Sequence, residues 1–526
     1  MKRHFYGTAS LMRLYLRQNR IFTLVWFLLP SLWYAINTLS SQVLFPTQEA
    51  LVEMGATLID PLTVAMHGPL LDISIAGFVT WRTKVFGVML CGIFSIIYMI
   101  RHTRLAEEQG KRELLGANVT GSLAPLAAAL LNMVFINLGM TVLAVSSMTV
   151  LGLGFIGSLA HCLGIFAAAC ALGILAGLAA QIFEISTAAR GASFGCLAVL
   201  FILHILWDVG GASHPAAYLN PIEWPLLVRP FAGERFAVLL IPLVAGLLFS
   251  ALSLLLMHRR DLGAGLFAQK KGREYAKPGF RSPAALAWRT QKGLFLSWLI
   301  AYAAVSFALG YASYLMAGAV SSAETLADLI TRLGGAERAF MSLMLYVLAM
   351  LLCIYALMAA GILRQEELAK GEMLLSLPVQ RRRFATSHLL YIFCAPAAIM
   401  TVSGLCVGLG AVSSTGENAM LARYFFEMFV KIPAVWAFGG IALFLFGLFP
   451  RWMGGASYGI WVLFILVEIL WEQQTVSDAL YAISPFSWVN PMRMLQPGGL
   501  MMLTGVAALL GFSGVWLFQK RDAALK

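Results

Sequence analysis

The sequence predicts an all-α integral membrane protein made of two similar halves, each crossing the bilayer six times. Of its 526 residues, 60% are hydrophobic and only 12% are charged, whereas soluble domains carry about 25% charged residues. Apolar runs close to the ~20 residues that cross a bilayer recur along the whole chain. Helices are the expected form of these runs, because an open sheet would leave unpaired backbone groups in lipid.

The apolar runs predict about twelve membrane-spanning helices. In the first half we place them at about 21–40, 85–100, 122–149, 155–182, 192–208 and 236–257. The runs of the second half lie at about 293–317, 341–363, 386–412, 430–450, 455–472 and 500–518.

Three collinear sequence matches indicate that the second half repeats the first. The first match pairs Arg17-x-x-Arg20 with Arg289-x-x-Lys292, at an offset of 272 residues. The second pairs two acidic segments at an offset of 259. The third pairs Gly191-Ala-Ser-Phe-Gly, Trp207-Asp208 and Pro221-x-x-Trp224 with Gly455-Ala-Ser-Tyr-Gly, Trp471-Glu472 and Pro485-x-x-Trp488, at an offset of 264. We expect one six-helix repeat over 1–260, a linker over 261–281 and a second repeat over 282–526.

Basic residues predict the orientation of the chain in the membrane. With both termini in the cytoplasm, the predicted inner segments hold 28 lysines and arginines and the outer segments hold 9, as the positive-inside rule requires. Because each half crosses an even number of times, the two repeats are expected to be parallel. The net charge of +12 then faces anionic membrane lipid and not a nucleic acid. The expected location is the plasma membrane of a bacterium.

Several kinds of active site are missing from the sequence. It contains no G-x-x-x-x-G-K-[ST] phosphate loop, so the chain is not expected to bind ATP by that motif. The eight histidines lack metal-ligand spacing, and no nucleophile or paired-carboxylate constellation stands out, so we expect no metal site and no cofactor. A transport protein is therefore favoured over an enzyme.

Two acidic segments, at 103–116 and 362–376, are the sharpest positive signal. Each follows the second span of its half on the predicted cytoplasmic side and is expected to form an amphipathic helix. The matching glutamates are Glu107, Glu108 and Glu113 in the first half and Glu366, Glu367 and Glu372 in the second. A solvated helix surface held by i, i+4 ion pairs would explain one such segment. Matching positions in halves that otherwise differ favour a docking surface for a symmetric cytoplasmic partner.

The second acidic segment ends as Glu372-Met-Leu-Leu-Ser376-Leu-Pro378-Val379, and in this it resembles the cytoplasmic segment of type 2 ABC exporter permeases. The duplicated twelve-span form is similar to permeases of polyketide-antibiotic or multidrug exporters. The first half departs from the pattern with Gly116-Ala-Asn-Val-Thr120. The resemblance implies a separate ATPase subunit in two copies, one under each acidic helix, which would bind ATP and Mg²⁺. It also implies a central pathway lined mainly by the second and fifth spans of each half.

Ionisable residues inside spans are costly and therefore mark candidate sites. His204 and Glu468 occupy equivalent positions, 264 residues apart, one turn before Trp207 and Trp471. A His–Glu pair across the pathway would seal an outer gate or bind a cationic drug. Alternatively, both groups reach external water and the two tryptophans anchor the chain at the membrane interface.

Two other functions stay open from sequence alone. A proton-coupled secondary drug transporter also has two parallel six-span halves, but only Glu468 lies plainly within a predicted span as a proton carrier. A membrane scaffold is disfavoured by the polar residues within spans. The substrate is not named by the sequence, although mostly apolar spans suggest a hydrophobic or amphipathic small molecule.

Overall fold

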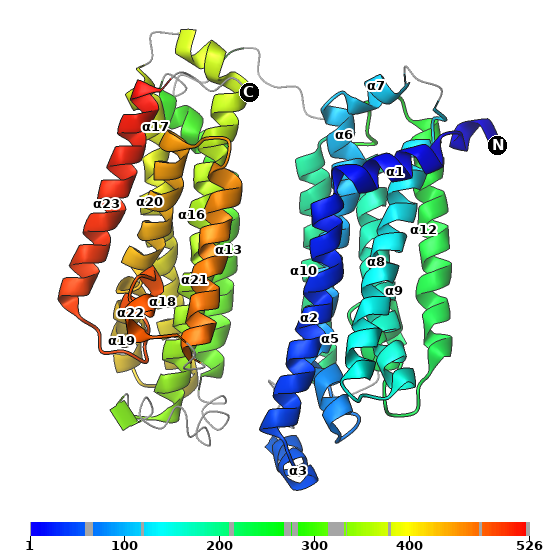
Figure 1. Cartoon of the computed structure of the whole chain (residues 1–526), viewed down its shortest axis with the longest axis horizontal. Coiled ribbons are helices and arrows are strands. Elements are labelled where there is room, and N and C mark those ends of the chain that lie inside the picture. Colours follow the sequence, from blue (N-terminus) through cyan, green and yellow to red (C-terminus); the bar gives the residue numbers. More distant parts are fainter. Residues whose placement is uncertain are drawn as a thin grey trace. The chain divides into compact units, whose positions relative to one another are not determined.

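The computed structural model describes residues 2–57, 67–116, 120–209, 215–267, 275, 282–313, 331–332, 334–376, 380–472 and 476–521. The chain divides into two compact units, Met1–Gly272 and Arg273–Lys526, which are described separately (Figure 1). In the described parts, twelve helical stretches are long and apolar enough to cross a membrane, six in each unit. The predicted all-helical fold and the predicted number of spans agree with this architecture.

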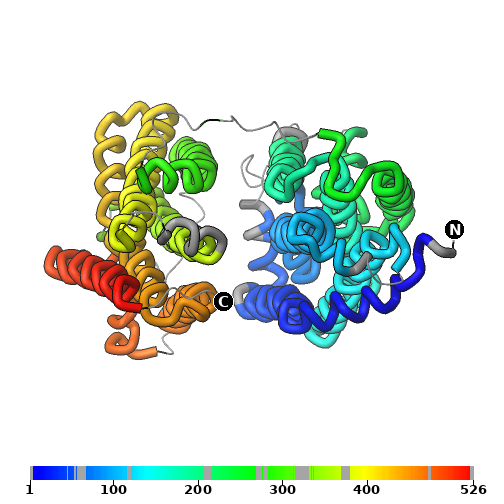
Figure 2. Tube along the Cα trace, turned by 90° about the horizontal axis from the view of Figure 1, so that it is seen from above, coloured from blue at the N-terminus to red at the C-terminus, as the bar shows by residue number. Residues whose placement is uncertain are grey.

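The spans of the first unit pack around two central helices. They are α2 (Arg20–Leu44), α5 (Ile75–His102), α8 (Ala124–Val150), α9 (Phe155–Ile182), α10 (Ser186–Val209) and α12 (Leu240–Arg259). Most side chains of α5 are buried, and α5 lies directly against α9. Glycines permit this contact, since a Cβ added at Gly92 would lie 2.4 Å from the Leu172 Cδ1 atom. Figure 2 shows the helices of each unit from above.

Shorter elements close both ends of the first unit. At one end, where the first span begins and the last span ends, lie α1 (Thr8–Gln18), α6 (Arg104–Glu108) and α7 (Lys111–Gly116). We call this the near end of a unit and the other the far end; the charge distribution predicts that the near end faces the cytoplasm. The far end carries α3 (Gln48–Thr57), η2 (Pro215–Leu219), α11 (Trp224–Leu227) and η3 (Phe236–Leu239).

The second unit has the same number of spans, two of which are interrupted. Its long helices are α13 (Pro283–Ala312), α16 (Ala336–Ser376), α17 (Arg381–Leu389) with the π-helical turn η5 (Leu390–Cys394) and α18 (Ala395–Thr415), α19 (Ala419–Phe429) with α20 (Ile432–Leu448), α21 (Met453–Glu472) and α23 (Pro497–Lys520). Its far end carries α22 (Asp478–Tyr481) and η6 (Pro485–Trp488). Buried apolar side chains from α16, α18 and α20 form the core.

The start of the second unit differs from that of the first. The segment with Arg289 and Lys292, which matches the segment with Arg17 and Arg20, forms the first turns of α13, whereas in the first unit α1 and α2 are separate helices. The Ser282 side chain accepts a hydrogen bond from the Ala285 backbone N–H, and Pro283 occupies the first turn. These are strong helix-start signals, and the helix then continues unbroken into the span.

Candidate functional site

The acidic segment of the first unit is two short helices. The chain leaves α5 at Thr103, forms α6, and turns at Gly110 before α7 begins. Gly110 has φ +68°, a left-handed conformation that favours glycine. The single amphipathic helix expected over 103–116 is therefore wrong for this unit. In the second unit the matching segment is the uninterrupted continuation of the second span, α16.

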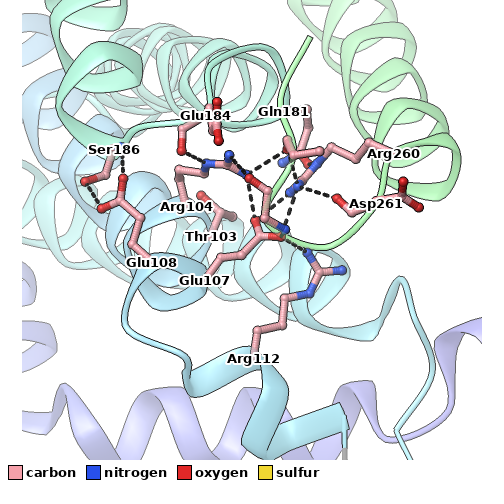
Figure 3. A network of polar contacts seen from close by, with 12 residues as sticks. Thr103, Arg104, Glu107, Glu108, Arg112, Gln181, Glu184, Ser186, Arg260 and Asp261 are labelled. Carbon is pink, nitrogen blue, oxygen red and sulfur yellow. Dashed lines mark hydrogen bonds and ion pairs between the residues drawn. The ribbon is translucent and has the colours of Figure 1, made fainter. Parts of the chain in front are cut away.

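Glu107 is the centre of a buried polar network at the near end (Figure 3). Arg260 donates from Nη1 to Glu107 Oε1 at 3.0 Å and from Nη2 to Oε2 at 2.7 Å, a bidentate pair. Arg104 Nη1 donates to Glu107 Oε2 at 3.0 Å, and Arg112 Nη1 donates to Oε1 at 3.2 Å. The Gly263 backbone N–H also donates to Oε1, at 2.9 Å. Only 8% of Glu107 is exposed. Its carboxylate therefore faces the interior of the unit and not a partner.

The arginine donors that Glu107 does not bind form hydrogen bonds with backbone carbonyls and with one side-chain amide. Arg104 donates to the carbonyl oxygens of Glu184, Gly263 and Ala264 at 2.7, 2.6 and 3.0 Å. Arg260 Nε donates to Gln181 Oε1 at 2.9 Å. Buried charged groups are stable only when paired and fully hydrogen-bonded. The bonds meet this condition and join the ends of α5, α9 and α12 to α6.

Glu108 connects the same short helix to the fifth span. Its Oε1 accepts a hydrogen bond from the Ser186 backbone N–H, and its Oε2 lies 2.5 Å from Ser186 Oγ. Ser186 is the first residue of α10, so a carboxylate sits at a helix N-terminus, where unpaired N–H groups and the helix dipole favour negative charge. Through Glu107 and Glu108, α6 is attached to the ends of three spans besides its own.

The second unit holds a network of the same kind. Arg364 Nη1 donates to Glu367 Oε2 at 2.6 Å, and Arg521 Nη2 lies 3.0 Å from the same oxygen and 2.9 Å from Oε1. Glu367 is 2% exposed. The Arg521 guanidinium also lies 5.0 Å from the ring centres of Phe446 and Phe518. At this distance the faces of the aromatic rings attract the cation.

The two networks correct the pairing of the acidic segments. The sequence match of the two Glu-Glu pairs had aligned Glu107 with Glu366, at an offset of 259 residues. The structure instead aligns Arg104-x-x-Glu107 with Arg364-x-x-Glu367, at an offset of 260 residues. Sequence analysis also missed the second arginine of each network. Its signal was the Arg-Asp dipeptide that follows the sixth and twelfth spans, at 260–261 and 521–522. We call each set, Arg104–Glu107–Arg260 and Arg364–Glu367–Arg521, the near-end clamp of its unit.

The other predicted glutamates take different positions. Glu113 is exposed on α7, and Glu366 is half-buried on α16. Two apolar side chains are exposed nearby, Leu114 by 73% and Leu368 by 50%. The Glu372 side chain lies outside the described residues.

His204 is buried within the far end of the first unit. It is 0% exposed, and its Nδ1 lies 2.5 Å from Glu223 Oε1. Lys84 Nζ, on α5, lies 4.0 Å from Glu223 Oε2. These three residues link α10 and α5 to the segment that precedes α11. The Trp207 side chain, one turn further on, lies outside the described residues.

Glu468 occupies a comparable place in the second unit, with different partners. Its Oε1 accepts hydrogen bonds from Tyr481 Oη at 2.8 Å and Asn490 Nδ2 at 2.7 Å. Burial, and secondarily the Glu468 charge, raises the pKa of Tyr481, so the phenol stays protonated as a donor. The Trp471 ring stacks on Tyr481 at 4.3 Å between centroids, and its Nε1 donates to Asp478 Oδ1 at 2.8 Å. Both His204 and Glu468 thus have partners within their own units.

One tryptophan in each far end makes the same local bond. Trp224 Nε1 donates to the Tyr218 carbonyl at 2.8 Å, and Trp488 Nε1 donates to the Ala482 carbonyl at 3.1 Å. Both bonds reach back six residues. They fold the segments 215–227 and 478–488 into compact turns, which the side chains of His204 and Glu468 then hold against the fifth span of each unit.

Comparison with known proteins gives two matches. A family model described as the C-terminal domain of the multidrug efflux system permease Rv1217c matches residues 280–519. The chain is also 29% identical over 532 residues to the multidrug efflux system permease protein Rv1217c of Mycobacterium tuberculosis (strain ATCC 25618 / H37Rv), with 98% of this chain and 95% of that protein covered. This chain is a multi-pass membrane protein, similar over nearly its whole length to an efflux permease.

Proposed function

We propose that this chain is the membrane-spanning subunit of an ATP-driven ABC exporter of the type 2 class, and that a separate ATPase subunit supplies the energy. Two copies of that subunit, holding ATP and Mg²⁺, would dock at the near ends of the two units. The observation that carries the proposal is the clamp, Arg-x-x-Glu with an arginine after the last span, which occurs at the near end of both units. Similarity to an efflux permease supports the outward direction of transport.

The clamp gives the short helices α6 and α7 a way to move the spans. A displacement of these helices would move α5, which is covalently continuous with α6. It would also move α12, through the Glu107–Arg260 pair, and α10, through the Glu108–Ser186 bonds. In the second unit, a force on the end of α16 reaches α23 through Arg521. Hydrogen-bonded, buried ion pairs are rigid compared with a flexible linker. Closure of an ATPase dimer would therefore reposition several spans together, as alternating access requires.

The structure changes which residues we assign to docking. Glu107 and Glu367 act as positioning residues, because their carboxylates bind arginines of their own units. Glu108 positions α10 in the same way. The docking surface that we propose is the remaining part of each segment, with Glu113 and Leu114 on α7 and Glu366 and Leu368 on α16; Glu372 keeps its proposed role there. These side chains combine negative charge with exposed apolar area, so the leucines would lie in the apolar core of the interface and the glutamates in its polar rim.

The exported compound that we propose is hydrophobic or amphipathic, because the spans offer mostly apolar walls. We assign the far-end residues His204, Trp207, Glu468 and Trp471 to an outer gate. The His204–Glu223 hydrogen bond, and the one that Tyr481 donates to Glu468, hold the segments around Glu223 and Tyr481 onto the fifth spans. Opening of the gate would move each segment with its span as one body.

The test is co-purification with an ABC ATPase subunit of the same organism, together with export of a fluorescent dye. Reversing charge by Glu113→Lys and Glu366→Lys should weaken association and reduce export, because each lost charged contact with a partner costs about 2–5 kcal/mol when it is buried in the complex. The matched control is Glu417→Lys, an exposed glutamate at the far end, which should associate and export normally.

The same purified proteins can distinguish an ATP-driven exporter from a proton-coupled transporter. Proteoliposomes that hold the chain and the ATPase should accumulate dye on addition of ATP without a pH gradient. Dye transport driven by a pH gradient in proteoliposomes that contain the chain alone would contradict the proposal.

A further inference from the structure

A large cavity opens at the far end of the second unit, away from the clamp. It has a volume of about 420 Å³, is open to the surface, and lies between the start of α16, the end of α19 and the segment that leads into α23. The lining residues that matter here are Arg332, Ser342, Phe426, Glu427, Lys431 and Arg493. A second, smaller cavity of about 110 Å³ shares Arg493 and Met494 with it. The Arg493 side chain therefore borders both cavities.

The cavity wall carries three basic side chains and one acidic side chain. Lys431 is buried, and its Nζ lies 3.5 Å from Glu427 Oε1. Glu427 also accepts a hydrogen bond from Ser342, so this carboxylate is already engaged. The two remaining basic residues, Arg332 and Arg493, leave a net positive charge on the wall.

The two arginines are held in place without a carboxylate. Arg332 donates from Nη2 to the Pro491 carbonyl. The Arg493 guanidinium lies 5.6 Å from the Tyr481 ring centre and 6.0 Å from that of Trp471. In the described part of the chain, neither forms an ion pair with aspartate or glutamate. Guanidinium groups that are positioned in this way, with donors to spare, are suited to bind phosphate oxygens.

The rim of the cavity is apolar and faces outward. Phe426 is 62% exposed, Met494 is 80% exposed and Leu495 is 49% exposed. This surface continues onto α19 and α23, where Phe429 and Met501 are 52% and 76% exposed. On a span, exposed apolar side chains of this kind face lipid tails. The cationic wall therefore lies beside the lipid-facing surface, at the level where α23 begins.

We infer that this cavity binds an anionic membrane lipid, with the phosphate of its head group at Arg332 and Arg493 and its acyl chains over Phe426 and Met494. An exported compound with an anionic head and an alkyl tail would share this chemistry. A lipid is the occupant that we assign, because the apolar rim runs directly into the lipid-facing sides of α19 and α23. The inference does not depend on the ATPase partner.

The test is native mass spectrometry of the whole chain, purified in a neutral detergent and mixed with defined lipids. Dioleoylphosphatidylglycerol should be retained, whereas dioleoylphosphatidylcholine, with the same tails and no net charge, should be lost. Arg332→Gln with Arg493→Gln should weaken retention of the anionic lipid about tenfold or more. Arg235→Gln is the matched control, since Arg235 is an exposed arginine at the far end of the first unit, and should retain the lipid.

Two further measurements, on the single Arg332→Gln variant and with inorganic phosphate as a competitor, complete the test. Arg332→Gln alone changes an exposed side chain and should lower retention even if the double variant fails to fold. Inorganic phosphate should not compete at millimolar concentration, because it lacks the tails that the rim binds. Equal retention of the two lipids, or unchanged retention by the Arg332→Gln variants, would overturn the inference. Loss of export of an anionic dye in the double variant with normal lipid retention would overturn it in favour of an exported compound.

Discussion

At the scale of single residues, the clamp explains why a glutamate recurs after the second span of each half. Glu107 accepts from three arginines and one backbone N–H, and Glu367 binds two arginines. A carboxylate supplies a negative charge and two oxygens with about four acceptor positions, so it can bind several guanidinium groups at once and accept a bidentate pair. The residue is thus required by its own unit, and the clamp supports the proposed partner through the segments that it fixes to the spans.

Glu107→Gln should destabilise the first unit, because it leaves the buried Arg104 and Arg260 without a negative partner. Removing one member of a buried ion pair costs about 3–5 kcal/mol. The measurement is the thermal unfolding midpoint in detergent, followed by tryptophan fluorescence. Glu113→Gln, on an exposed side chain of the next short helix, should unfold like the parent. Equal midpoints for the two variants would show that the clamp contributes nothing to stability.

Glu468 offers a separate test, because its role depends on one oxygen atom that accepts two hydrogen bonds. Glu468→Gln keeps a carbonyl oxygen for Tyr481 and Asn490, so only a small loss of stability is expected. Glu468→Leu removes this acceptor, so the buried Tyr481 hydroxyl loses its 2.8 Å bond at a cost of about 1–3 kcal/mol, whereas Asn490 Nδ2 keeps its 2.7 Å bond to Tyr481 Oη. Thermal unfolding and limited proteolysis of segment 478–488 should rank the parent above the Gln variant and the Gln variant above the Leu variant. The reverse order for the two variants would assign the role to the charge.

At the scale of elements, glycines set the distance between helices. In the second unit, α13 and α18 meet at two glycines: a Cβ at Gly310 would lie 2.0 Å from the Val407 carbonyl oxygen, and one at Gly410 would lie 2.2 Å from that of Phe307. The sequence motif Gly404-x-x-x-Gly408 makes another close contact, with α19. Small residues are the usual means by which membrane helices approach, because lipid supplies no hydrophobic force between them.

Gly410→Ala should therefore destabilise the second unit by about 1–3 kcal/mol, the usual cost of overpacking. Gly361→Ala is the control, since a Cβ at Gly361 meets no atom within 4 Å and alanine favours a helix. Unfolding midpoints in the same detergent should fall for the first variant and stay level or rise for the second. A parent-like midpoint for Gly410→Ala would mean that the two helices can separate freely.

The number and approximate position of the spans could be predicted from the sequence. Which side chains of a helix face the interior of a unit could not. Spans were predictable because bilayer thickness sets their length and composition. The match of Glu-Glu motifs was one residue in error, and on a helix one residue corresponds to a rotation of about 100°. That difference decides whether Glu366 or Glu367 points at Arg521. Arg260 lies 153 residues from Glu107, and Glu223 lies 19 residues from His204, so helical periodicity does not identify these two partners.

At the scale of the whole molecule, similarity to an efflux permease favours a transport subunit, and we propose that its energy comes from a separate ATPase. The purified chain should therefore hydrolyse no ATP, because its sequence contains no phosphate-binding loop. A coupled assay of phosphate release measures this, with the same preparation plus the ATPase as the positive control. Steady turnover by the chain alone, which persists after further purification, would contradict this assignment.

The clamp also has a consequence for biosynthesis. Glu107 and Arg260 are 153 residues apart, and Glu367 and Arg521 are 154 apart. A ribosome adds about 5–20 residues per second, so each carboxylate waits about 8–30 s for its arginine. During that interval the glutamate has to stay solvated or be shielded by insertion factors. Each half can lock only when its last helix has been made, so the first half can mature while the second is still being translated.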